Sequence, residues 1–573
     1  MGAPLRRGPL GATLLRLFPI AAFLVLIAPV VAGLAGIFLP AFGYLPVLGR
    51  DELSLAPFRD LLAMPGLGRS VLLSLGCGLA ATAVAFTVVM LFVAGWRGTR
   101  LFAALERLVS PMLSVPHAAA AFGLAFLIAP SGFLFRLAAE ATGIWDRPPD
   151  LLIVQDRLGV TMTVGLIVKE IPFLLLMMLA ALPQARGPEM ERMSASLGYG
   201  RIVGFLHGIL PGLYRQIRLA VLAVLAFSTS VVDVALILGP TTPAPLAVRL
   251  LAWQRDADLD MHFTAAAGAV LQVGVTALAL AIWLVGERLA AFLCRRLARS
   301  GWRGRADQWA RRLAAFLMTL SATTVLSGLG LLALWSLAGP WRFPDALPAT
   351  LSLSTWMRLP ASLGMAFRDT LALAAASSLA AIVLALGSLE FQARTSRSGA
   401  GRTLQALYVP LLVPQIAFLF GLQILFSYAG FDGTFFAVML VHLVFVFPYV
   451  LLSLSDPWWA WDPRYGHAVR ALGRGPDTVF WRVRLPMLAR PVLTAAALGF
   501  AVSVALYLPT LLIGGGRWPT VTTEAVALAS GGDPRLIGAT ALLQALLPFL
   551  GFAVAALLSA VLFRNRRRMW AST

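Results

Sequence analysis

The chain has little of the charge that a water-soluble protein carries on its surface. Only 13% of its 573 residues are Asp, Glu, Lys or Arg, and 59% are hydrophobic. Soluble domains average about a quarter charged residues, so this composition excludes a soluble enzyme, a disordered chain and a secreted disulfide scaffold. It indicates a polytopic membrane protein, and the 51 glycines and 36 prolines are typical of membrane helices.

Cysteines and metal-ligand patterns are also scarce. Cys77 lies within an apolar run and Cys294 at the basic end of another, which gives no support for a disulfide or a zinc site. His, Cys and acidic residues nowhere cluster with the spacing of metal ligands. We therefore expect this chain to bind no metal and no cofactor of its own.

Lysine occurs only once, at Lys169. A nucleotide-binding P-loop needs Gly-Lys followed by Ser or Thr, because the lysine and the backbone N–H groups hold the phosphates. Lys169 instead follows Val168 and precedes Glu170. This sequence thus contains no P-loop, and an ATPase that served it would be a separate polypeptide.

The net charge of +20 comes from arginines that recur in short clusters between apolar runs, while acidic residues collect in the alternate loops. The basic clusters are Arg97, Arg100 and Arg107; Arg295, Arg296 and Arg299; Arg394, Arg397 and Arg402; and Arg564, Arg566, Arg567 and Arg568. The acidic loops contain Asp51 and Glu52, Asp146 and Asp150, and Asp256, Asp258 and Asp260. Such alternation follows the positive-inside rule, so the charge predicts topology rather than nucleic-acid binding. It places both termini and the linker 293–312 in the cytoplasm.

About twelve apolar runs are long enough to cross a membrane, which takes about 20 residues. They lie near 14–40, 71–95, 110–131, 158–182, 217–238, 264–292, 313–338, 370–391, 404–428, 434–454, 491–515 and 537–563. The first run is apolar over 18–39, longer than the apolar stretch of about 7–15 residues in a signal peptide. We expect it to be a retained helix.

The sequence repeats itself. Matching pairs occur in order along the two halves: Arg69 with Arg368, Pro116 with Pro414, Pro172 with Pro448, Gly198 with Gly473, Pro211 with Pro486, and Gln272 with Gln544. Their separation falls from about 298 to about 276 between the third and fourth helices, so the first half carries an insertion there, within the polar stretch 131–157. The chain is predicted to be a tandem duplication of a six-helix unit, forming parallel repeats because the helix number is even.

This organisation predicts six segments. They are 1–60, an N-terminal helix and external loop; 61–292, a first repeat unit; 293–312, a basic cytoplasmic linker; 313–360, an extra helix and external loop; 361–563, a second repeat unit; and 564–573, a basic cytoplasmic tail.

The connection between the fourth and fifth helices has a similar pattern in each half. The first contains Glu191, Ala195, Leu197 and Gly198 and reaches Leu210-Pro211; the second contains Ala468, Leu472 and Gly473 and reaches Val483, Leu485 and Pro486. We expect a short amphipathic helix that ends at the glycine, which tolerates positive φ. A second short helix is expected to end at the proline, which cannot continue a helix interior.

With these two loops the chain resembles the permease subunits of binding-protein-dependent ABC importers, and among them the fused two-unit permeases of the iron(III) and thiamine type. The family's loop reads Glu-Ala-Ala, three residues, Gly, nine residues, then Ile-x-Leu-Pro. The second loop matches at Ala468, Gly473, Val483, Leu485 and Pro486 but has His467 for the Glu; the first matches at Gly198, Leu210 and Pro211, with Glu191 one place early.

The resemblance implies an all-α, type I importer permease with about twelve helices in a bacterial inner membrane. It also implies that both loops are coupling helices that dock on a pair of separate P-loop ATPase subunits, which bind ATP and Mg²⁺. An extracytoplasmic binding protein would deliver a small solute. Iron, thiamine, polyamines and sulfate-like anions all remain candidate solutes.

Five polar residues fall at membrane depth, where such side chains normally face a bundle interior or a cavity. Lys169 and Glu170 precede Pro172, Asp233 lies in the fifth helix, and Gln272 and Gln544 occupy matching places in the last helix of each half. They are candidate pathway residues. The alternatives are internal pairing for the charged residues and interhelical hydrogen bonds for the glutamines.

The main alternative function is a twelve-helix secondary transporter driven by an ion gradient. The commonest such superfamily has a Gly/Asp/Arg signature between helices two and three, and the sequence 95–100 there contains no Asp. A membrane-embedded enzyme would need a cluster of catalytic polar groups, and the sequence shows none. The chain is therefore predicted to be a transport component and not an enzyme.

Overall fold

The computed structural model describes residues 9–185, 187–395 and 409–564, and within these ranges every regular element is helical apart from two isolated β-bridges. Ten helices there are long and apolar enough to cross a membrane, and a bent pair, 476–487 with 489–505, would make an eleventh. A shorter apolar helix covers Gln415–Tyr428. The predicted all-α polytopic class is confirmed. The start of the predicted span 404–428, together with Arg397, Arg402 and the tail from 565, lies outside the described residues.

The helices of the first half run in the predicted order. They are α1 (Pro9–Ala41), α2 (Ala56–Ala63), α3 (Leu67–Trp96), α4 (Arg100–Val109), α5 (His117–Ile128), α6 (Phe133–Thr142), α7 (Val160–Ala181), α8 (Gly187–Ser196), α9 (Arg201–Gly204), α10 (Leu210–Ser230), α11 (Asp233–Leu238), α12 (Leu246–Gln254) and α13 (Asp260–Arg299). Helix α6 lies in the predicted insertion and has no described helical counterpart in the second half.

The second half repeats this series. Its helices are α14 (Gln308–Leu337), α15 (Ser354–Met357), α16 (Ala361–Thr395), α18 (Val409–Leu412), α19 (Gln415–Tyr428), α20 (Phe435–Ala460), α21 (Pro463–Ala471), α22 (Pro476–Val479), α23 (Leu485–Met487), α24 (Ala489–Ala505), α25 (Leu508–Gly514), α26 (Val521–Ala527) and α27 (Pro534–Leu562).

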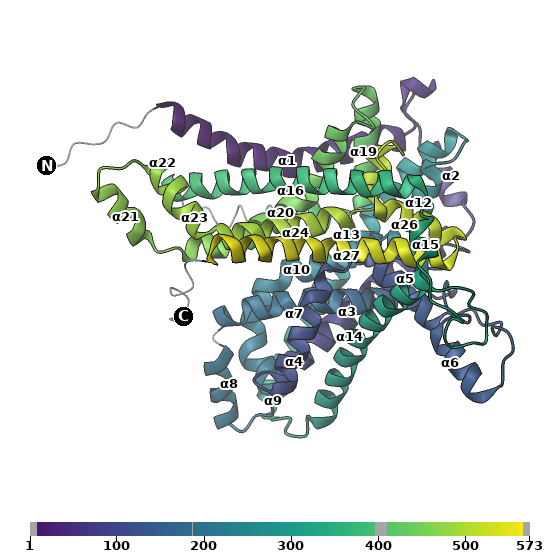
Figure 1. The fold of residues 1–573 in the computed structure, drawn as a ribbon, viewed down its shortest axis with the longest axis horizontal. Helices are drawn as coiled ribbons and strands as arrows, with labels where there is room; N and C mark the ends of the chain where they lie inside the picture. Colours follow the sequence, from purple (N-terminus) through teal and green to yellow (C-terminus); the bar gives the residue numbers. More distant parts are fainter. Residues whose placement is uncertain (1–8, 186, 396–408, 565–573) are drawn as a thin grey trace.

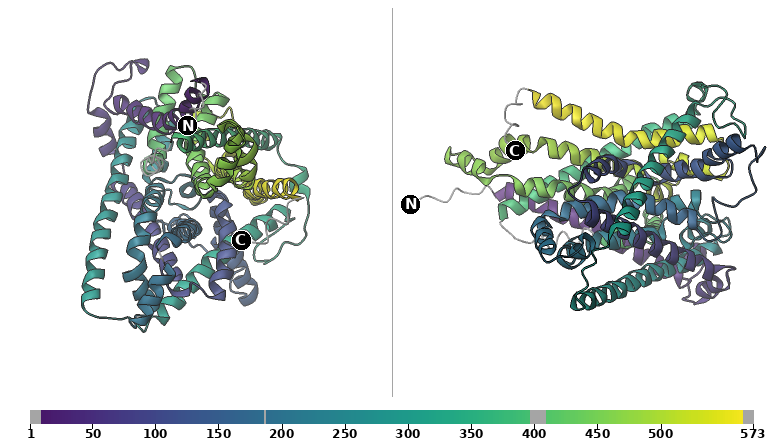
Figure 2. Two further views of the ribbon diagram at one scale, coloured as in Figure 1. Left: turned by 90° about the vertical axis from the view of Figure 1, so that its left-hand side faces the viewer. Right: turned by 90° about the horizontal axis from the view of Figure 1, so that it is seen from below.

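The loops between the fourth and fifth helices lie at one end of the molecule (Figure 1). We call residues 182–209 the first connector and residues 461–484 the second connector, and the end where they lie the connector side. The left panel of Figure 2 looks at the molecule from that side. There the first half (blue to teal) and the second half (green to yellow) form two adjacent groups.

The first helix of each half packs mainly on the other half. Helix α1 lies along α16 and α19, while α14 lies along α3 and α5 (Figure 1). Glycines permit both contacts, because a Cβ on Gly33 would overlap the carbonyl oxygen of Phe418 and a Cβ on Gly123 would lie 2.8 Å from the Cα of Gly328. Small residues that let helix backbones approach closely are the usual means of packing in membranes. This exchange ties the two halves into one body.

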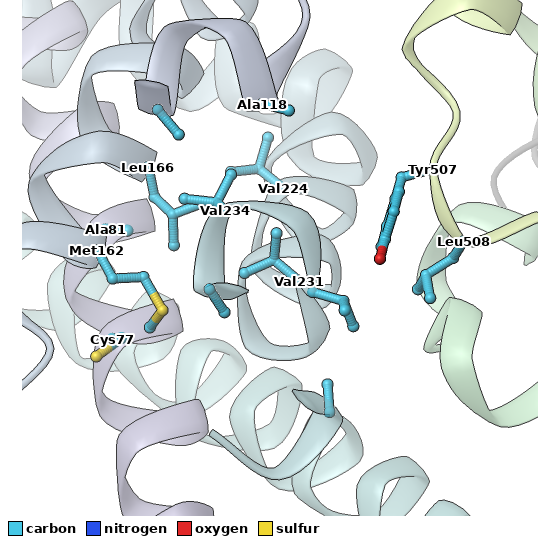
Figure 3. Close-up of a cluster of buried hydrophobic side chains, with 14 of the residues drawn as sticks. Cys77, Ala81, Ala118, Met162, Leu166, Val224, Val231, Val234, Tyr507 and Leu508 are labelled. Atoms are coloured by element: carbon cyan, nitrogen blue, oxygen red, sulfur yellow. The ribbon is translucent and has the colours of Figure 1, made fainter. Parts of the chain in front are cut away.

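The fifth helix of each half is broken at the same place. Val231 has an extended backbone between α10 and α11, and Leu506 has one between α24 and α25. Around these breaks one apolar core contains residues of both halves, including Val231 and Val234 of the first and Tyr507 and Leu508 of the second (Figure 3). The duplicated sequence thus places two equivalent helix breaks at the contact between the halves.

Candidate functional site: two connectors and a buried polar cluster

The two connectors have nearly the same backbone. Each begins with a short helix, α8 or α21, that is followed by a glycine in the left-handed conformation, Gly198 at φ +77° and Gly473 at φ +73°. Glycine adopts this conformation without the steric cost that a Cβ brings. A second short helix, α9 or α22, then leads into one π-helical turn, Phe205–Ile209 in the first connector and Phe480–Arg484 in the second.

The prediction that the second short helix ends at the proline is wrong. Leu210-Pro211 and Leu485-Pro486 instead begin the next helices, α10 and α23, with the proline in the first turn. Proline is favoured there because the first-turn N–H groups have no partner within the helix and its φ suits a helix start. Arg201–Ser230 passes through its π turn and Pro211 as one span, and the 71° bend of the second half lies after Pro486, between 476–487 and 489–505.

Both connectors expose apolar side chains at their tips. Leu197 is 58% exposed and Leu472 is 80% exposed, each directly before its glycine. Met193 of α8 and Tyr465 of α21 are also about half exposed. Of the other predicted residues, Ala195, Ala468, Pro211 and Pro486 are exposed, and Glu191, Leu210, Val483 and Leu485 are partly buried.

The first connector is held by the linker between the halves. Asp307 accepts a hydrogen bond from the backbone N–H of Ile202 at 3.1 Å, so it caps α9 in place of Gly200, which has no side chain. Gly200 N–H donates to the carbonyl of Arg303 at 2.8 Å, and Arg305 donates to the carbonyl of Gly198 at 3.2 Å.

Helix α14 extends this contact to α3. Arg311 donates to the carbonyl of Gly95 at 3.1 Å, and its own carbonyl accepts from the indole N–H of Trp96 at 2.7 Å. Gly95 is needed for this approach, because a Cβ there would lie 2.7 Å from the Cγ of Arg311. Arg97 adds an ion pair to Glu191 of α8. The first connector is therefore anchored by the linker together with the end of α3, where the carbonyl of Gly95 also accepts from Arg201 at 3.1 Å.

The second connector is held within its own half. Glu390 of α16, whose side chain is 7% exposed, accepts hydrogen bonds from Arg394 at 2.6 Å and Arg484 at 3.2 Å. Arg394 also pairs with Asp477 of α22 at 2.9 Å. The guanidinium of Arg484 lies between the rings of Trp458 and Trp461, 4.4 and 4.5 Å from their centroids. Sequence reasoning missed this network because its members lie far apart in the chain.

The first helix of the second connector has a side-chain cap. Asp462 accepts from the backbone N–H of Arg464 at 2.9 Å and from its guanidinium at 2.8 Å. These contacts, the backbone hydrogen bond first, hold the pKa of Asp462 below its ordinary value. At neutral pH the carboxylate is therefore ionised and stabilises the start of α21.

Lys169 and Glu170 are both buried and bind different partners. Lys169 Nζ donates to the carbonyl of Met112 at 3.2 Å, and Glu170 Oε1 lies 3.4 Å from Nε2 of His117. The ring of His117 packs on Phe227, 4.9 Å between centroids. His117 thus joins α5 to α7 at this cluster.

Asp233 lies at the start of α11, directly after the break in the fifth helix, where it interacts electrostatically with His117 and Tyr507. Tyr507 and Leu508 lie opposite Val231 across the contact between the halves (Figure 3). His117, Lys169, Glu170 and Asp233 form what we call the polar cluster. It belongs to the first half, because the matching residues of the second half are Gln415, Phe445, Val446 and Leu508.

The two glutamines are completely buried and hold the last helices in place. Gln272 Nε2 donates to the carbonyl of Thr229 at 3.2 Å, and Gln544 Nε2 donates to Thr522 Oγ1 at 3.0 Å. Sequence reasoning missed a further buried group, His442, which contacts Ser503 at 2.8 Å and Thr510 at 2.9 Å. Among the described residues no three His, Cys, Asp or Glu side chains could hold a metal ion.

Comparison with known proteins decides the family. The chain is 32% identical over 530 residues to the inner membrane ABC transporter permease protein YnjC of Escherichia coli K12, covering 92% of this chain and 95% of that protein. This chain belongs to the ABC transporter permeases. It is a multi-pass inner-membrane permease of an ABC importer and a transport component, and the secondary-transporter alternative is not favoured.

Shorter matches agree with this family. The molybdenum transport system permease protein ModB of Mycobacterium tuberculosis is 30% identical over 157 residues, covering 25% of this chain and 59% of that protein. The spermidine/putrescine transport system permease protein PotC of Haemophilus influenzae is 27% identical over 134 residues, covering 22% of this chain and 50% of that protein. No family model matches the chain.

Proposed function

We propose that the two connectors are the coupling loops of this permease and that they dock on two separate P-loop ATPase subunits. The supporting observation is their equivalence: both place an exposed leucine, Leu197 or Leu472, directly before a left-handed glycine at the tip of the loop. ATP and Mg²⁺ would be bound by those subunits, since this sequence contains no P-loop. An extracytoplasmic binding protein would deliver the solute from the other side.

This proposal fixes the orientation of the chain. Connectors that meet an ATPase lie in the cytoplasm, and the arginine clusters at 97–107 and 295–299 lie on the same side. Helix α1 starts and α27 ends on the connector side (Figure 1). Both ends of the chain would then be cytoplasmic.

The solute pathway would run between the halves, past the paired breaks in the fifth helices. Val231, Tyr507 and Leu508 would close it in the present state, since they belong to one buried core (Figure 3). Asp233 of the polar cluster lies next to this contact, directly after the break at Val231, whereas Gln272 and Gln544 hold the flanking helices. Broken helices at a repeat interface are a common way to build a transport site.

The test is the copurification of an ATPase with the tagged chain. Replacing Leu197 and Leu472 together with Asp should abolish recovery of a P-loop ATPase, because a charge would enter the apolar contact. The matched control is Leu353→Asp, which alters a leucine that is 60% exposed at the opposite end. Unchanged ATPase recovery and unchanged solute uptake in the double variant would refute the proposal.

A second arm tests coupling rather than docking. Gly473→Val should raise the ATP hydrolysed per solute imported, because a β-branched residue at φ +73° displaces the loop. Gly430→Val is the matched control, since Gly430 also has a positive φ, +62°, and open space around it but lies at the opposite end. Equal coupling in the two variants would count against a role for the second connector.

A further inference from the structure

A cavity of about 560 Å³ lies between α24 and α27 near their connector-side ends. Its apolar wall consists of Phe552, Ala555, Ala556 and Ala560 of α27, and Arg490 lies at the rim at the start of α24. All lining side chains come from these two helices and Phe563, the residue after α27. Two helices alone cannot enclose a space, so the cavity is open on one side. We call it the groove.

The wall of the groove is mainly apolar. Its two hydroxyl groups are satisfied within their own helices, because Thr494 donates to the carbonyl of Arg490 at 3.1 Å and Ser559 donates to the carbonyl of Ala555 at 2.8 Å. Arg490 is the one charged side chain among those that line it. The groove therefore combines an alanine-rich wall with a cation at one end.

At the equivalent place in the first half, large side chains lie between α10 and α13. The residues that match Ala555 and Ser559 are Trp283 and Glu287, and the residue that matches Ala489 is Tyr214. Trp283 donates to the hydroxyl of Tyr214 at 2.9 Å, and Tyr214 donates to Glu287 at 2.6 Å. Arg218 completes this cluster with an ion pair to Glu287 at 2.9 Å. The second half has the smaller Ala489, Ala555 and Ser559 at the positions of Tyr214, Trp283 and Glu287.

The position of the groove identifies the kind of molecule that fits it. Helix α24 begins at Ala489 and α27 ends at Leu562, so the rim lies at the boundary between the hydrocarbon layer and water. An acyl chain can pack against the alanines, and a phosphate can pair with the guanidinium of Arg490. Basic pockets between membrane helices at this depth suit anionic lipid headgroups.

We propose that this groove binds one anionic phospholipid, with its phosphate at Arg490 and an acyl chain along Ala555, Ala556 and Ala560. The volume is within the range of about 300–1,000 Å³ that is usual for ligand sites. The lipid site does not depend on the docking of an ATPase, so it can be tested on the purified chain alone. A negative result for lipid binding would leave the proposed coupling function untouched, and the reverse also holds.

The experiment is native mass spectrometry of the purified chain in detergent, with phosphatidylglycerol or phosphatidylcholine added as the probe. The wild-type chain should retain one phosphatidylglycerol in preference to phosphatidylcholine. Arg490→Gln should reduce that preference about fivefold, the effect of about 1 kcal/mol per arginine near a membrane surface. Arg215→Gln is the matched control, since Arg215 is the first-half counterpart and should leave the preference unchanged.

A second variant tests the acyl-chain wall. Ala555→Trp introduces the residue that stands at the equivalent position of the first half and should remove the bound lipid of either kind. Ala556→Leu narrows the same groove with a smaller side chain and should also reduce lipid retention. This variant serves as the test of the acyl-chain wall if the tryptophan variant does not fold. Equal retention of the two lipids by the wild type, or unchanged phosphatidylglycerol binding in Arg490→Gln and the wall variants, would overturn the proposal.

Discussion

The two connectors share a backbone but are anchored by different parts of the chain. In the second connector, Glu390, Arg394 and Arg484 of the same half form the anchor. In the first, Leu91 and Gly95 stand at the positions of Glu390 and Arg394, and Asp307 and Arg305 of the linker contact the connector instead. The difference shows that, when two repeats are joined in one chain, the linker between them can hold the connector of one repeat. The other connector then depends on contacts within its own half.

The largest expected effect comes from removing the buried carboxylate of the second connector. Glu390→Ala leaves Arg484 without its charge partner, and Arg394 with only the exposed Asp477, in a mostly buried site; breaking a buried pair typically costs about 3–5 kcal/mol. The measurement is the unfolding midpoint of the purified protein in detergent. Glu191→Ala, which removes a carboxylate that is 40% exposed in the first connector, should cost at most about 1 kcal/mol. Equal losses would contradict the comparison.

A second prediction compares the loss of stability when Gly198 or Gly473 is replaced. Alanine at either Gly198 or Gly473 adds a left-handed cost of about 1–2 kcal/mol. At Gly198 the new Cβ would also lie 2.9 Å from a guanidinium nitrogen of Arg305, whereas at Gly473 it meets open space. Gly198→Ala should therefore destabilise the protein more than Gly473→Ala in the same unfolding measurement. The reverse order would show that Arg305 does not hold the first connector.

A third prediction concerns the linker. Asp307→Ala removes the acceptor that caps α9, at a cost of about 0.5–2 kcal/mol typical for a lost cap. Hydrogen exchange should become faster at the backbone amide of Ile202 and stay unchanged in the second connector. Asp477→Ala is the matched control and should show the opposite pattern, because Asp477 pairs with Arg394. A change in both connectors after either substitution would mean that they are not anchored independently.

The smallest expected effect is a pH dependence of the second connector. The folded-state pKa of Asp462 lies below its ordinary value of 3.8, so its cap is fully present above that value and is lost as pH falls through the lowered pKa. Exchange at the Arg464 amide should then become faster than at the Gly200 amide, which donates to the backbone carbonyl of Arg303, after correction for intrinsic rates. The same change in Asp462→Ala would show that another group is responsible.

The parts of the structure that depend on local pattern could be predicted from the sequence. Apolar runs gave the spans, and Gly198 and Gly473 gave the ends of two short helices, because a helix end with positive φ needs glycine. The role of Pro211 was predicted incorrectly, since a proline can stop one helix or start the next and the π turn that decides between them has no local signal.

Contacts between distant segments could not be predicted in this way. Nothing near Asp307 in the sequence indicates that it caps a helix 105 residues earlier. The same holds for the exchange of α1 and α14 between the halves and for the contact of Glu170 with His117. These depend on which helices become neighbours, and the repeat pattern alone does not determine that.

The most direct test of the coupling-loop assignment is site-specific photo-crosslinking in membranes. A photoreactive residue would be placed at Leu197, Leu472 or, as a control at the opposite end, Leu353. The account predicts that positions 197 and 472 each form an adduct with a P-loop ATPase and that position 353 does not. It would be contradicted if an ATPase copurified with the chain but crosslinked at neither connector, or crosslinked only at position 353.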